Sequence, residues 1–164
     1  MRIAEAIGLR RSDCKVSSGV RYVLLEPNDA RTLKTKTSKR EIPIVGLAER
    51  AIDTLMTGVE RHDPLFYNYV RDGVANANSA SGAINKWLRQ VTGNDQVTSH
   101  CFRHTLKDML MEAGVPKPVQ TAIGGWGSSD ISDNYGKGYS LRVKKEALEA
   151  ALSNLLLEGL GTTV

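Results

Sequence analysis

Residues 99–105 combine two side-chain types that are suited to phosphate chemistry. On a helix with about 100° between successive residues, His100, Arg103 and His104 fall on one arc. An imidazole transfers a proton near neutral pH, and a guanidinium holds a phosphate through two parallel hydrogen bonds. The pair therefore suits phosphoryl transfer. On this helix alone, a solvated face without a chemical role is the favoured interpretation, and His104 also fits a hydrogen-bonded structural histidine.

An apolar face must anchor this helix, which is expected over residues 99–113. Five residues fall within about 100° of arc beside the polar set and are predicted to face the core. They are Phe102, Leu106, Met109, Leu110 and Ala113. Gly114, with Pro116 beyond it, should end the helix.

Helices are expected to dominate the remaining chain. Apolar periodicity predicts further helices at 2–9, 46–59, 79–91, 117–123 and 141–157. The helix at 79–91 has an apolar stripe of Ile84, Trp87, Leu88 and Val91, and Ser79 or Ser81 is its candidate N-cap. The polar stretch 61–78 is predicted to be a loop.

Two strands are expected before these helices. Residues 20–25 are rich in β-formers, and residues 40–44 alternate polar and apolar types. Pro43 favours an edge position for the second strand because proline cannot donate to a sheet ladder. The predicted class is therefore α+β, mostly helical with a small antiparallel β-sheet.

Composition narrows the class of protein. The chain has 164 residues, 41% of them hydrophobic and 24% charged, as in an ordinary globular domain. No apolar run is long enough to span a membrane. Cys14 and Cys101 lack a motif spacing, which favours reduced thiols in a cytoplasmic protein, and no metal-ligand pattern includes the three histidines.

The distribution of charge is more informative than its sum. The formal net charge of +4 permits a polyanionic partner without requiring one. Five basic residues cluster ahead of the second strand, where a hairpin should turn: Arg31, Lys34, Lys36, Lys39 and Arg40. Taken alone, this run favours a solvated hairpin tip.

Four segments in sequence order resemble the conserved boxes of the tyrosine recombinases, the phage integrase family. Residues 2–9 resemble the first arginine box, and 33–43 resemble the β-hairpin lysine segment. Residues 99–105 resemble the His-x-x-Arg box. Residues 125–129, followed by Tyr135, resemble the closing box, with Tyr135 nine positions after Trp126. The resemblance covers essentially all of residues 2–140, and the ordered set is far more specific than a single His-x-x-Arg.

The resemblance implies a fold and a reaction. The fold would be the integrase catalytic core, and the chain a catalytic domain over 1–164. The Tyr135 hydroxyl would attack a DNA phosphodiester, forming a 3′-phosphotyrosyl link and releasing a 5′-hydroxyl. Strand exchange and religation would follow without cofactor or metal, because the phosphotyrosine conserves the bond energy.

The resemblance also assigns roles to the remaining site residues. Arg2 and Arg103 would bind the nonbridging phosphate oxygens, and His100 would accept the tyrosine proton. Lys34 is the first choice to protonate the leaving oxygen and Lys36 fits nearly as well, so the sequence does not settle between them. Glu5 would either orient the site or form an ordinary exposed salt bridge.

Two departures from the family pattern affect these expectations. Trp126 stands where most members have histidine, and an indole donates one hydrogen bond but cannot act as a base. The first helix of the domain and the separate DNA-clamping domain that precede the first arginine in the family are expected to be absent here.

The resemblance further implies partners and a location. Double-stranded DNA would be the substrate, and the helix at 141–157 would either pack on its own core or dock onto a neighbouring subunit of a tetramer. A cytoplasmic location in a bacterium, or a phage origin, would follow. Two alternatives remain: a type IB topoisomerase-like enzyme, and a catalytically idle DNA-binding or subunit-interacting fragment.

Overall fold

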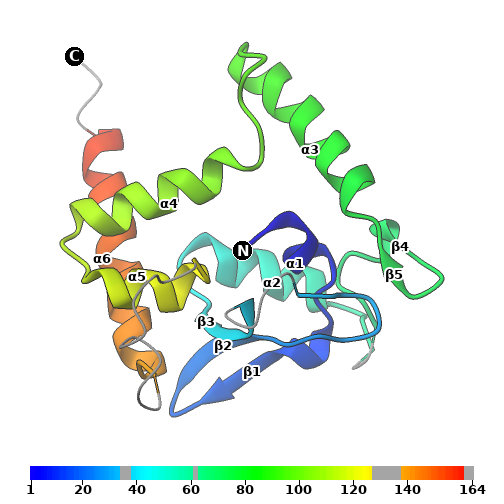
Figure 1. The fold of residues 1–164 in the computed structure, drawn as a ribbon, viewed down its shortest axis with the longest axis horizontal. Helices are drawn as coiled ribbons and strands as arrows, with labels where there is room; N and C mark the ends of the chain where they lie inside the picture. The colour runs from blue at the N-terminus through cyan, green and yellow to red at the C-terminus, as the bar shows by residue number, and fades with distance from the viewer. Residues whose placement is uncertain (34–37, 61–62, 127–137, 161–164) are drawn as a thin grey trace.

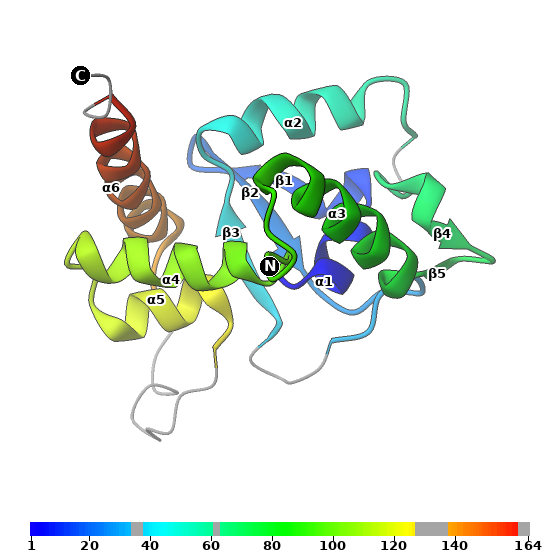
Figure 2. The same ribbon diagram turned by 90° about the horizontal axis from the view of Figure 1, so that it is seen from above.

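The computed structural model describes residues 1–33, 38–60, 63–126 and 138–160, and within this part the chain is an α+β protein. A three-stranded antiparallel sheet in the order β1-β2-β3 lies between two groups of helices. Helices α4 to α6 lie at one end, and α1 to α3 lie at the other (Figures 1 and 2). No helix in the described ranges has the length and apolar character needed to cross a membrane.

The sheet contains one strand more than the sequence predicts. β1 (Cys14–Ser17) pairs with β2 (Val20–Leu25), and β2 pairs with β3 (Arg40–Pro43) in a register that places Leu25 opposite Arg40. Pro43 lies on an edge strand as expected. β1 is exposed along most of its length, so it lacks the apolar alternation that would have revealed it.

Helices form where apolar periodicity predicts them, with shifted ends. They are α1 (Ile3–Ile7), α2 (Leu47–Met56), α3 (Ala77–Thr92), α4 (Cys101–Glu112), α5 (Lys117–Gly124) and α6 (Leu141–Leu160). The expected loop at 61–78 is wrong in part, because a 3-10 turn (Tyr67–Tyr69) and the short hairpin β4 (Val70–Arg71) and β5 (Val74–Ala75) lie there. The cap of α3 is Asn76, whose side chain accepts from the Ser79 N–H, rather than either serine.

Two apolar cores meet at β3. One lies among α4, α5 and α6 and includes Leu110, Ile123 and Leu148. The other lies between the sheet and α2 and includes Val23 and Ile52. Ile42 of β3 packs against both clusters. The edge strand therefore couples the helical end of the molecule to the sheet.

The apolar faces of α3 and α4 are only partly used. Phe102 is 61% exposed, so the expectation that it faces the core is wrong. The C-terminal end of α4 crosses α6 (Figures 1 and 2). Phe102 lies in the first turn of α4, at the opposite end of that helix. On α3, Leu88 is buried, whereas Trp87 and Val91 are exposed. Periodicity identifies the apolar face but not how far the packing partner extends.

Arg31 and Arg40 are buried, which corrects the interpretation of the basic run as a wholly solvated tip. Arg31 is only 2% exposed. Its guanidinium donates to the carbonyls of Gly8 and Glu26 at 3.1 and 2.7 Å, and it pairs with Asp13 at 3.0 Å. This arginine therefore ties the end of α1 to the long connection between β2 and β3.

The close approach of Arg31 to Gly8 gives a test of this packing. A Cβ on Gly8 would lie 2.7 Å from the Arg31 Cβ, so Gly8→Ala should lower the free energy of unfolding by about 1–3 kcal/mol through overpacking. Gly82→Ala on α3 is the control, because a Cβ there meets open space. This substitution should raise the free energy of unfolding by about 0.5–1 kcal/mol, since alanine favours the helix over glycine. Urea unfolding of both variants measures the difference, and equal midpoints would contradict the described packing.

Candidate active site

Arg2 lies at the N-cap of α1, where Glu5 fixes it. The Arg2 backbone N–H donates to Glu5 Oε2 at 2.7 Å, and Arg2 Nη1 donates to Glu5 Oε1 at 2.9 Å. Arg2 Nη1 also donates to Ser38 Oγ at 3.1 Å. The Arg2 side chain remains 31% exposed, so a large ion could reach it from solvent.

Glu5 is buried, which rules out the alternative of an exposed surface acid. The residue is 3% exposed, and its carboxylate also accepts from Arg40 Nη1 at 3.3 Å and Nη2 at 3.0 Å. Burial opposes ionisation, but the hydrogen bonds from Arg40 and Arg2 outweigh it and lower the Glu5 pKa to about 2. Glu5 is therefore a permanently ionised centre between two arginines.

Arg103, a site residue predicted from the sequence, is a buried arginine. It lies in the first turn of α4 and is 9% exposed, yet its buried Nη1 has no hydrogen-bond partner among the residues that the structure describes. Burial and then the neighbouring charges of Arg2 and Arg40 lower its pKa. Because a guanidinium stays protonated in proteins, a buried donor with no acceptor is costly unless an anion arrives.

Trp126 covers Arg103 from the end of α5. The Arg103 Cζ lies 4.9 Å from the indole centroid, within cation–π range. The ring is partly buried against the core of α4, α5 and α6, as expected for an aromatic that also packs. Gly124 allows this position, since a Cβ there would lie 2.1 Å from the ring.

His100 is one turn before Arg103 but has a different environment. It is exposed at the N-cap of α4, and its carbonyl accepts from the Arg103 N–H at 3.0 Å. Its ring meets that of His104 edge to face, with 4.8 Å between centroids. His100 therefore lies at the N-cap, three positions before Arg103, and of the two only Arg103 is buried.

Three predicted site residues, Lys34, Lys36 and Tyr135, lie outside the described residues. The elements that flank them are described. Ser38, which bonds Arg2, is fully buried, and Lys144 near the start of α6 donates to the Glu41 carbonyl at 3.0 Å. The first of these contacts reaches Arg2, and the second reaches strand β3.

Arg40 is a site residue that sequence reasoning missed. The sequence groups it with the basic run, because its partners Glu5 and Ile123 are distant along the chain. Arg2, Arg40 and Arg103 supply three positive charges, against one negative charge from Glu5. The site therefore has a net charge of +2 and is suited to an anion.

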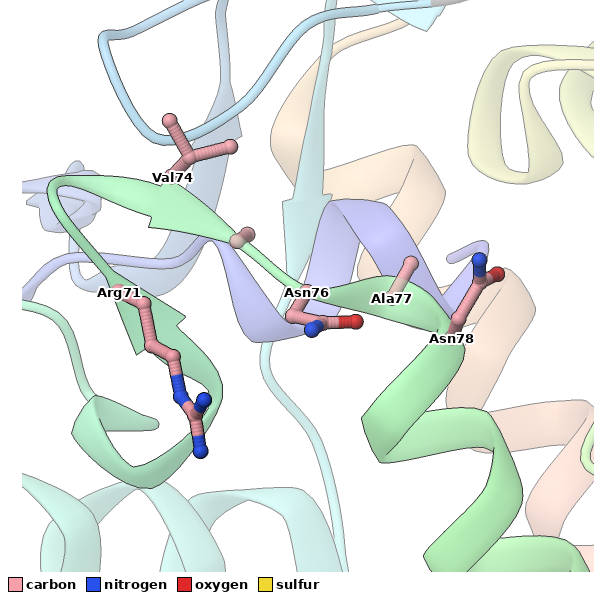
Figure 3. Close-up of a pocket in the computed structure, with 6 residues that line it drawn as sticks. Arg71, Val74, Asn76, Ala77 and Asn78 are labelled. Carbon is pink, nitrogen blue, oxygen red and sulfur yellow. The ribbon is translucent and has the colours of Figure 1, made fainter.

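A separate pocket lies at the base of α3. Its volume is about 420 Å³, and Arg71, Val74 and Asn76 to Asn78 are among its lining residues. Figure 3 shows Arg71 and Asn78 pointing away from each other, so these donors do not converge. None of the predicted site residues that the structure describes is among its lining residues. Within the described residues, no cluster of three or more histidines, cysteines or carboxylates could hold a metal ion.

Comparison with known proteins identifies the family. The model of the phage integrase family matches residues 1–140. This chain belongs to the phage integrase family. The matched range includes Arg2, Glu5, Arg103, Trp126 and Tyr135, so the family expected from the four boxes is confirmed.

A curated relative agrees with this membership. The "Probable integrase/recombinase" of Acholeplasma phage L2 is 28% identical over 116 residues, which cover 70% of this chain. Those residues cover 37% of the relative, so the chain spans little more than a third of that protein. No solved structure matches this integrase-family chain at a significant level.

The Glu5 environment predicts how stability depends on pH. The folded pKa, about 2, is below the ordinary value of 4.5, so ionised Glu5 stabilises the fold above pH 4.5. That contribution, on the order of 3 kcal/mol, is lost as pH falls from 4.5 towards 2. Glu5→Gln should therefore be less stable than wild type at pH 7, and the two should converge near pH 2.

Urea unfolding between pH 2 and 7 measures this convergence. Glu149→Gln is the control, because Glu149 is an exposed partner of Lys145 on α6. Parallel curves for wild type and Glu5→Gln across the whole range would contradict the assignment of Glu5 as a buried, permanently charged group.

Proposed function

We propose that this chain is the catalytic domain of a site-specific tyrosine recombinase that breaks and rejoins double-stranded DNA. The observation that carries the proposal is the unpartnered Nη1 of Arg103, buried in a site of net positive charge. A DNA phosphate supplies the acceptor and the negative charge that this site lacks. Family membership over residues 1–140 supports the same substrate class.

The reaction begins with attack by the Tyr135 hydroxyl on the scissile phosphorus. The P–O bond to the 5′-oxygen breaks while the tyrosyl oxygen forms a new bond, giving a 3′-phosphotyrosyl link and a 5′-hydroxyl. The 5′-hydroxyl of a partner strand reverses this step and rejoins the backbone. The number of phosphodiester-type bonds is unchanged in each step, so the reaction needs no external energy source.

Proton transfers and charge stabilisation divide among the other residues. A phenol with a pKa of about 10 is almost fully protonated at neutral pH, and His100 accepts its proton. Arg2 and Arg103 bind the nonbridging oxygens, whose negative charge increases in the transition state. The Trp126 indole N–H donates to the same phosphate. Lys34 or Lys36 returns a proton to the leaving 5′-oxygen.

The wider context of the proposal follows from the family. The domain adopts the integrase catalytic core, works in the cytoplasm on phage or bacterial DNA, and assembles as a tetramer on its substrate. The first half of α6 packs into its own core through Leu148 and Ala151.

A nicked suicide DNA substrate tests the covalent step. Wild type at low salt should form a protein–DNA adduct, seen as a shifted band on a denaturing gel, and Tyr135→Phe should form none. Tyr139→Phe is the control, because it removes a nearby tyrosine outside the closing box. Absence of an adduct with wild type would favour the catalytically idle fragment, and low salt is needed because phosphate contacts weaken as salt rises.

Removal of the buried donor tests the phosphate clamp. Arg103→Ala should slow adduct formation by roughly 100- to 1,000-fold, comparable to the loss of one oxyanion-hole donor. Arg21→Ala is the control, since Arg21 forms an exposed ion pair with Asp53 away from this site. An equal effect of the two substitutions on the single-turnover rate would refute the assignment.

A modified substrate distinguishes Lys34 from Lys36. Replacing the bridging 5′-oxygen with sulfur gives a thiolate leaving group of much lower pKa, which departs without a proton. Lys34→Ala and Lys36→Ala should each be assayed on both substrates. The variant that is slow with oxygen but restored with sulfur identifies the general acid, and restoration of neither would exclude both lysines.

A further inference from the structure

Arg40 occupies the centre of the site without facing solvent. Its side chain is 5% exposed, and its donors reach three segments of the chain. Nε donates to the Ile123 carbonyl at the end of α5 at 3.0 Å, and Nη1 donates to the Ser38 carbonyl at 2.7 Å. Nη1 and Nη2 both bond the Glu5 carboxylate on α1.

The residues that Arg40 holds are those that orient Arg2. Arg2 Nη1 bonds only short polar side chains in the described region, Glu5 and Ser38. Arg40 bonds the carboxylate of Glu5 and the backbone of Ser38. The position of the Arg2 guanidinium is therefore determined by two groups that share one buried anchor.

Arg40 also contacts the backbone at Gly125, just before Trp126. Gly125 has a left-handed backbone with φ of 61°, and a Cβ there would lie 2.6 Å from Arg40 Nη1. The chain therefore passes directly over the Arg40 guanidinium before it reaches Trp126, which stacks on Arg103. Arg40 contacts both the segment before Trp126 and the group that holds Arg2.

We infer that Arg40 is a positioning residue of the recombination site, which holds Glu5 and Ser38 so that Arg2 faces the phosphate beside Arg103. This inference rests on the proposed function for the identity of the anion. Arg40 does not contact DNA in this assignment. It acts through Glu5, whose charge it balances, and its substitution should alter the site through that carboxylate.

The electrostatic consequence can be derived from the groups around Glu5. Arg2 precedes α1, Arg40 lies on β3, Arg103 lies on α4, and Arg31 donates weakly to the Glu5 carbonyl at 3.5 Å. The Met1 amino group also faces the cluster, with a pKa lowered by burial to about 6. Without Arg40, burial would raise the Glu5 pKa from about 2 towards or above the ordinary value of 4.5.

Protonated Glu5 could no longer hold Arg2 by an ion pair. At pH 7, the loss of the Arg40 hydrogen bonds to Glu5 and Ser38 should by itself reduce the single-turnover rate of Arg40→Gln adduct formation roughly 10- to 100-fold, as expected for a misplaced clamp. Its rate should fall further as pH decreases through the new Glu5 pKa. Protonation of the Met1 amine adds positive charge in that range and so works in the opposite direction. Wild type should show no decline attributable to Glu5 above pH 4.

The experiment measures adduct formation at saturating suicide DNA between pH 4 and 7.5. Arg40→Lys restores a positive charge beside Glu5 but not the fork that also reaches Ile123, so it should remove the added acidic decline while recovering only part of the rate. Arg31→Gln is the matched control. This substitution also removes a buried arginine and should destabilise the fold. Arg31 does not bond the Glu5 carboxylate, however, so the pH profile of Arg31→Gln should match that of wild type.

A second measurement is independent of catalysis. Carboxyl NMR of ¹³C-labelled protein should show the Glu5 resonance titrating at higher pH in Arg40→Gln than in wild type or Arg31→Gln. A protection assay with inorganic phosphate should show weaker thermal stabilisation of Arg40→Gln than of Arg31→Gln.

The outcomes separate the two proposals. An Arg40→Gln profile that keeps the wild-type shape, with an unshifted Glu5 resonance, would overturn the positioning role and leave Arg40 merely structural. Failure of wild type to form any adduct would refute the recombinase proposal. In that case, the NMR titration and phosphate protection would still support or contradict the role of Arg40 in an anion site.

Discussion

The site depends on burying more positive than negative charge in one place. Removing an ion from water costs several kcal/mol unless its partners and hydrogen bonds compensate. Glu5 provides that compensation for Arg40 and, in part, for Arg2. Among the described residues, Arg103 has no such partner and retains a buried donor without an acceptor. This imbalance costs stability, and the proposed phosphate ligand would remove it.

Strand β3 connects this charge arrangement to the rest of the fold. Its successive residues make different contacts. Arg40 bonds the Glu5 carboxylate, and the Glu41 carbonyl accepts from Lys144 of α6. Ile42 packs against both apolar cores. Burial lowers the pKa of Lys144, while the Glu41 carboxylate and carbonyl favour its charged form. The start of α6 is therefore fixed to the same edge strand that carries Arg40.

The sequence predicted the parts of this arrangement that depend on local periodicity and motif order. The α4 spacing placed His100 and Arg103 on neighbouring positions, and the alternation at 40–44 located β3 with Pro43 at the edge. Local pattern could not reveal that Arg40 is buried, because its partners Glu5 and Ile123 are distant in sequence. The prediction that Phe102 faces the core is wrong for a similar reason. Periodicity identifies the apolar face of α4 but not how much of that face α6 covers. β1 was missed because both of its faces are largely exposed.

The stacking of Trp126 on Arg103 explains how the site keeps its donors available. A carboxylate or carbonyl partner would have stabilised the guanidinium by accepting its N–H groups, and those groups would then be lost to a phosphate. An aromatic face instead attracts the cation perpendicular to its plane and leaves the in-plane donors unused. Gly124 provides the space for this contact, and Arg40 supports the backbone at Gly125. Tryptophan at this position therefore contacts Arg103 without accepting any of its N–H groups, which leaves them for the phosphate in the proposed reaction.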